Sequence, residues 1–209
     1  QTTTNPLSLT WDDGSTAGGT SAVSQPSTAA GSYYYRINTR SAEVWRTRLT
    51  VTSGEANLYL NKGVLPLQNS AAAKASIKTG SDGLILSNVE FKPGEDWYII
   101  VESTGPSSNW NLVTGNPYVQ DLGRLPFTDS NSDGTYNIGE ASQNGGVAGQ
   151  IMGPEGVAFF KATLPPNVPA WALWLNGANH LMAVRKNQVP VLFTLATQAD
   201  RKQNGNLLL

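Results

Sequence analysis

Short segments in which apolar and polar residues alternate, with turn residues between them, constrain this chain most. The clearest is residues 45–51, where Trp, Thr, Leu and Val alternate with Arg, Arg and Thr. Similar strand patterns lie at residues 33–37, 58–60, 83–86 and 97–102. Strands about 8–12 residues apart with turn residues between them are typical of a β-sandwich. We therefore predict an all-β fold of jelly-roll-like antiparallel β-sandwiches.

Composition supports this fold and excludes two kinds of partner. The chain has 21 glycines and 12 prolines, and its helix pattern at residues 71–75 is too short to stand alone. The net charge of −1 argues against a nucleic-acid partner, which needs a dense basic surface. No apolar run approaches the roughly 20 residues that cross a bilayer. We expect neither nucleic-acid binding nor a membrane span.

Cysteine is absent from the 209 residues. This excludes disulfides, thiol catalysis and zinc sites built on cysteine. A cysteine-free chain of this kind fits the exterior of a bacterium better than a small animal secreted domain, which disulfides usually stabilise. The polar stretch that begins at Gln1 is what a mature protein would show after cleavage of a signal peptide. We expect a secreted or cell-surface protein.

The second half of the chain repeats the first at a nearly constant offset. Residues 34–37, 45–49, 58–67 and 83–86 match residues 159–162, 171–175, 181–191 and 205–208. The alternative is that any two strand-rich segments look alike. The repeat predicts an N-terminal strand and flexible connector (1–30), a first sandwich (31–115), a linker (116–150) and a second sandwich (151–209).

The second sandwich is expected to be incomplete. The first sandwich contains a strand at residues 97–101, and the matching strand of the second sandwich does not occur in the sequence up to Leu209. A sandwich that lacks a strand exposes an apolar seam and an unpaired edge. A longer natural chain would supply the strand, or another chain would donate it in an assembly.

Residues 34–101 resemble the bacterial pre-peptidase C-terminal domain family. The motifs that carry the resemblance are the aromatic opening strand at 34–36, the segment 45–50, the turn and strand Ser-Gly-Glu-Ala-Asn-Leu-Tyr-Leu at 53–60, and the closing strand at 93–101. Residues 155–209 resemble the same family more weakly. The resemblance implies tandem jelly-roll-like sandwiches that act as accessory modules beside exported enzymes, with no catalytic residues.

Residues 129–140 have the spacing of a calcium-binding loop. Oxygen ligands fall at loop positions 1, 3, 5, 9 and 12, a glycine stands at position 6, and position 7 offers its backbone carbonyl. Glycines and Pro126 on the flanks exclude the two long helices of an EF-hand. The alternative is a plain surface loop. We predict a structural Ca²⁺ ion in the linker, and its ligands are Asp129, Asn131, Asp133, Thr135, Asn137 and Glu140.

Catalysis has little support in the sequence. His180 is the single histidine, so a Ser-His-Asp triad would have to be built on it, and a turn position at a strand start explains it better. The acidic pairs at 12–13 and 95–96 flank turns, and neighbours on a strand point to opposite faces, so we expect solvated ends. We predict no catalytic residue and no enzyme.

The tryptophans divide into predicted core and predicted surface. Trp45, Trp97 and Trp171 belong on inward faces. Trp11, Trp110 and Trp174 lie in polar or outward positions, where they would stack on sugar rings or anchor a protein, unless a neighbouring segment buries them.

Three functions remain after these exclusions. We predict a structural or adhesive module of an exported bacterial protein, stiffened by calcium and able to assemble by strand exchange between copies. The alternative is a carbohydrate- or matrix-binding module of a secreted hydrolase, and the third is an enzyme. The expected partners are a polysaccharide, an extracellular protein or further copies of the chain.

Overall fold

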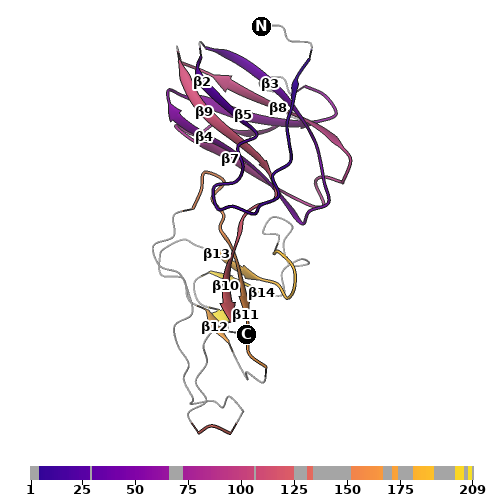
Figure 1. The fold of residues 1–209 in the computed structure, drawn as a ribbon, viewed down its shortest axis with the longest axis vertical. Coiled ribbons are helices and arrows are strands. Elements are labelled where there is room, and N and C mark those ends of the chain that lie inside the picture. Colours follow the sequence, from indigo (N-terminus) through magenta and orange to yellow (C-terminus); the bar gives the residue numbers. More distant parts are fainter. Residues whose placement is uncertain are drawn as a thin grey trace. The chain divides into compact units, whose positions relative to one another are not determined.

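The computed structural model describes residues 5–28, 30–65, 73–105, 107–124, 131–133, 152–166, 171–173, 181–190, 201–204 and 207–208. All regular structure in these residues is β-strand, as predicted (Figure 1). No helix among them has the length and apolarity needed to cross a membrane. The chain forms two compact units, residues 1–118 with Met152–Ala158, and residues 119–151 with 159–209.

The first unit is a β-sandwich of two sheets. Its nine strands are β1 (Leu7–Ser8), β2 (Val23–Thr28), β3 (Gly31–Asn38), β4 (Val44–Ser53), β5 (Ala56–Lys62), β6 (Lys74–Ser76), β7 (Asp82–Ser87), β8 (Asp96–Ser103) and β9 (Ser108–Gly115). The five-stranded sheet has the order β1-β3-β8-β5-β6, and the four-stranded sheet has the order β2-β9-β4-β7. Neighbouring strands are antiparallel, except that β1 runs parallel to β3.

Apolar side chains from the inner faces of both sheets form one core. The alternation predicted for residues 45–51 is confirmed, since Trp45 and Leu49 are fully buried in that core. Trp97 of β8 meets Trp45 edge to face at 5.1 Å between ring centroids, so an aromatic pair joins the two sheets. The five strand patterns recognised in the sequence all lie within observed strands.

The flexible connector predicted within residues 1–30 is wrong in part. Val23–Thr28 forms β2, whose Val23 pairs with Leu112 of β9. Pro26 obscured this strand, because proline removes a backbone donor. It is tolerated here because β2 is an edge strand whose register shifts between Gln25 and Thr28. The sandwich therefore begins before residue 31, and β1 belongs to it as well.

The described residues of the second unit form three two-stranded sheets. Its strands are β10 (Val119–Arg124), β11 (Phe159–Thr163), β12 (Ala172–Leu173), β13 (Leu181–Val184), β14 (Arg201–Asn204) and β15 (Leu207–Leu208). β10 pairs with β11 in parallel, while β12 pairs with β15 and β13 with β14 in antiparallel fashion. A second sandwich of the same design stays a prediction.

Candidate functional site

The outer face of the four-stranded sheet carries two arginines on β4. Alternation along β4 turns Arg46 and Arg48 away from the core, as predicted. An outward side chain on a two-layer sandwich is normally solvated. Arg46 is nevertheless only 1% exposed. Segments from outside the sheet must therefore cover this face.

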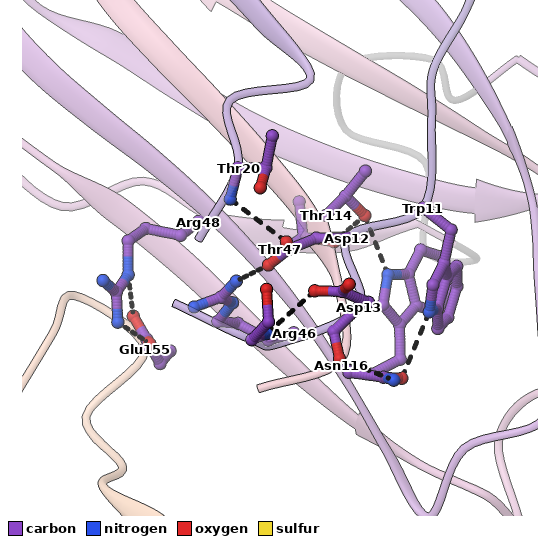
Figure 2. A network of polar contacts seen from close by, with 12 residues as sticks. Trp11, Asp12, Asp13, Thr20, Arg46, Thr47, Arg48, Thr114, Asn116 and Glu155 are labelled. Carbon is purple, nitrogen blue, oxygen red and sulfur yellow. Dashed lines mark hydrogen bonds and ion pairs between the residues drawn. The ribbon is translucent and has the colours of Figure 1, made fainter. Parts of the chain in front are cut away.

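The N-terminal segment covers Arg46 and neutralises it. Asp12 Oδ2 lies 2.6 Å from Arg46 Nη2, and both side chains are buried (Figure 2). The backbone N–H of Thr20 donates to the other carboxylate oxygen of Asp12 at 3.1 Å. Gly19 fits here because a Cβ would lie 2.5 Å from both Arg46 and Val113, and its φ of +74° suits glycine. Residues 12–20, which we call the strap, thus lie against the sheet.

Backbone contacts fix the start of the strap beside β9. The N–H of Asp12 donates to the carbonyl of Thr114 at 2.9 Å, and its own carbonyl accepts from Asn116 at 2.8 Å. The indole N–H of Trp11 donates to the side-chain oxygen of Asn116 at 3.1 Å (Figure 2). Directly beneath, the indole N–H of Trp45 donates to Thr114 at 2.8 Å. The polar network therefore continues from the outer face into the core.

A turn from much later in the chain covers Arg48 in the same way. Gly156 N–H donates to the carbonyl of Gly153 at 2.8 Å, which closes a turn that presents Glu155. Arg48 Nε donates to Glu155 Oε2 at 3.0 Å, and its Nη2 contacts the other carboxylate oxygen (Figure 2). Lys78 also donates to the carbonyl of Pro154 at 2.8 Å. We call residues 153–156 the clasp.

The electrostatics explain why each arginine needs a carboxylate. Burial lowers the pKa of Arg46, the nearby Arg48 lowers it further, and Asp12 and Glu155 counteract both effects. Arginine keeps its proton in proteins. Two adjacent buried or half-buried guanidinium groups would repel each other without counter-ions. The network therefore holds the strap and the clasp, which are remote from β4 in sequence, against the sheet.

A second polar cluster lies at the start of β7. Asp82 is fully buried, and its Oδ1 accepts from Ser76 Oγ at 2.6 Å and from Lys78 N–H at 2.9 Å. Glu55 accepts from Gly80 N–H at 2.8 Å in the same loop. Burial is the largest cause that raises the pKa of Asp82, and Glu55 adds to it.

The structure contradicts the predicted exposure of Trp11 and Trp110. Trp11 is 6% exposed and packs against Trp45 and Phe91 in the core. Trp110 is 1% exposed on β9, where Tyr33 meets its ring edge to face at 4.9 Å. Trp110 was assigned to a polar loop and Trp11 to the start of an acidic turn, because their neighbours in sequence are polar. Trp110 instead faces inward on β9, and Trp11 packs into the core just before the strap. Trp174 lies outside the described residues.

The other assignments have mixed outcomes. Trp45 and Trp97 are core residues, as predicted, whereas Trp171 is half-buried. Asp12 is not a solvated end, since it is buried against Arg46, while Asp13 is exposed. His180 lies outside the described residues. The sequence analysis did not identify Asp12 and Glu155 as ion-pair partners. The two outward arginines on one strand could have indicated that carboxylates lie nearby.

The predicted calcium loop stays a prediction. Asn131 and Asp133 are described, and Asp133 N–H donates to Asn131 Oδ1 at 3.0 Å, which is a local turn. Their side chains are also in contact, with 3.1 Å between Asn131 Nδ2 and Asp133 Oδ2. Asp129, Thr135, Asn137 and Glu140 lie outside the described residues. Within the described part of the chain, no group of three or more His, Cys, Asp and Glu side chains gathers as a metal site.

Comparison with known proteins gives a partial likeness to a solved structure. No protein-family model matches the chain, and no curated protein matches it. A solved structure, the pre-peptidase C-terminal domain of collagenase from Bacillus anthracis, is 14% identical and aligns over 53% of this chain and 94% of that chain. The TM-score is 0.36, and at that value the likeness carries no inference about this chain.

Removal of one partner of the buried ion pair should destabilise the first unit strongly. We expect Asp12→Ala to cost roughly 3–5 kcal/mol in free energy of unfolding, because it leaves the Arg46 charge buried and unpaired. Urea denaturation measures this. The control is Lys74→Ala, which breaks the partly exposed pair with Glu90 and should cost less than about 1 kcal/mol.

The double variant Asp12→Leu with Arg46→Met separates charge from packing. It should cost less than Asp12→Ala alone, because no unpaired charge remains. A single Asp12→Ala variant as stable as the wild type would show that the strap does not depend on this pair.

Asp82 should make stability depend on pH in the direction opposite to an ordinary ion-paired aspartate. Because its pKa in the folded state is raised above the ordinary 3.8, the folded protein binds the proton more tightly than the unfolded chain. The free energy of unfolding therefore falls as pH rises through the interval between 3.8 and the raised value. Asp82→Asn should abolish this fall, which denaturation at several pH values would reveal. An unchanged slope in the variant would assign the pH dependence to other groups.

Proposed function

We propose that this chain is a non-catalytic, extracellular structural or adhesive module of an exported bacterial protein, stiffened by calcium. One observation supports it most. The buried charges of the first unit, Asp12 with Arg46 and Glu155 with Arg48, bind remote segments of the chain to the sheet. Ionisable groups held in this way contribute to rigidity, whereas a general acid or base needs access to a substrate.

Features of the sequence agree with an exported module. The chain lacks cysteine and has few charged residues, and its motifs resemble accessory domains of exported enzymes.

In both units the aromatic strand pairs in parallel with an earlier strand, β3 with β1 and β11 with β10. This shared pairing supports the proposal of tandem copies. Open strand edges in such an arrangement would allow strand exchange between copies.

The function is tested by seeking turnover. We expect no hydrolysis of esterase, glycosidase or peptidase substrates beyond the buffer rate, and no difference between the wild type and His180→Ala, since His180 is the single histidine. Turnover that His180→Ala abolishes would replace the proposal with an enzyme.

The calcium part is tested by thermal unfolding. Saturating Ca²⁺ should raise the melting temperature by roughly several degrees relative to chelator, because a ligand that binds only the folded state stabilises it. Asp133→Asn with Glu140→Gln should remove most of this shift, while the control Asp13→Asn, an exposed acid outside the loop, should retain it. An identical melt of the wild type with calcium and with chelator would end the calcium proposal.

A further inference from the structure

The outer face of the five-stranded sheet gathers tyrosines. Inner positions of β3 and β8, such as Tyr35 and Ile99, belong to the core, so the residues between them point outward. The outward positions include Tyr34 on β3 and Tyr98 on β8, and the same alternation places Tyr59 of β5 outward. All three tyrosines are half-buried.

The register of the sheet places two of these tyrosines in one row. Tyr34 pairs with Ile100, and Ile100 pairs with Tyr59 on the other side of β8. The row therefore runs across the strands, and Tyr34 and Tyr59 stand two strand spacings apart, about 9.5 Å. Tyr98 lies on β8 beside this row.

The two tyrosines of the row flank a buried side chain. Ile100 is outward-facing and lies outside the core cluster, yet it is only 2% exposed. Tyr34 and Tyr59 stand on either side of it in the register, where cross-strand neighbours pack against one another. Tyr59 Oη donates to Glu102 Oε2 at 3.1 Å, which fixes that ring. Burial and then Glu102 raise the pKa of Tyr59, so its hydroxyl keeps its proton at neutral pH.

The charges around the row are few. Arg36, on the next row of β3, is exposed, and Asp96 and Glu102 on the outward face of β8 carry the opposite charge. Asn57 of β5 pairs with Glu102 across the strands and adds an amide. Amide, carboxylate and phenol groups beside aromatic rings suit a ligand rich in hydroxyl groups. A surface with one cation and two anions has little net charge, which favours an uncharged ligand.

We propose that this face, with Tyr34, Tyr59 and Tyr98 at its centre, binds an extended, uncharged polysaccharide. An extended glycan suits this face, because two tyrosine rings about 9.5 Å apart can stack on sugar rings of one chain. On the opposite sheet, by contrast, the strap and the clasp cover Arg46 and Arg48 of β4. The inference rests on the proposed function and deepens it. It names the class of ligand to which the exported module attaches.

The test is retention on insoluble polysaccharides. Cellulose, chitin and xylan are each mixed with the full chain, and the protein left in solution is measured. We expect at least one of them to retain the wild type. Tyr34→Ala and Tyr59→Ala should each weaken retention roughly tenfold or more, and the double variant should abolish it.

Matched controls separate ring stacking from folding. Tyr34→Phe keeps the ring and should retain binding, and Tyr118→Ala removes a half-buried tyrosine outside this face and should bind like the wild type. Melting temperatures of all variants report whether the sandwich stays folded. Equal retention of the wild type and a folded double variant would overturn the proposal.

Two further outcomes would also overturn it. One is no retention on any of the three polysaccharides. The other is retention on immobilised gelatin alone, which would assign the face to a protein partner. Neither outcome affects the turnover and calcium measurements, so failure of the polysaccharide proposal is distinguishable from failure of the proposed function.

Discussion

The ion pair between Asp12 and Arg46 is the interaction on which the shape of the first unit depends. Strand alternation places a guanidinium group on the outer face of β4, and the surrounding segments bury it almost completely. A buried cation without a counter-ion is strongly unfavourable, so the strap has to bring its carboxylate to this position. The contact then determines where Trp11 packs and where residues 12–20 lie.

The same requirement recurs two residues along β4. Arg48 receives its counter-ion from Glu155, and the clasp packs so closely that a Cβ at Gly83 would lie 2.5 Å from the Glu155 backbone nitrogen. Met152–Ala158 consequently groups with the first unit, although the repeat assigned it to the second. Each arginine thus binds a segment that makes no strand pairing with β4 and would otherwise not be held against the sheet. The two faces of the sandwich differ as a result, one covered by chain and the other presenting tyrosines.

Much of the sheet structure was predictable from local pattern. Residues 45–51 and 97–102 alternate so regularly that their inner faces, and hence Trp45 and Trp97 in the core, follow from the sequence. Val23–Thr28 was not predictable, because proline and small polar residues give no strand signal and pairing with β9 alone makes them a strand. Trp110 was misplaced for a similar reason, since polar neighbours hid a strand that the adjacent β4 completes.

The sequence by itself determined that the chain is all-β, which side chains of each regular strand face inward, and that two arginines share the outward face of β4. The tertiary structure decided which outward groups are covered, and by what. Asp12 lies 34 residues from Arg46, and Glu155 lies 107 residues from Arg48. The row of Tyr34, Ile100 and Tyr59 likewise joins three strands. Alternation is a local property of the backbone, whereas burial of a charge and alignment of rings depend on contacts between distant segments.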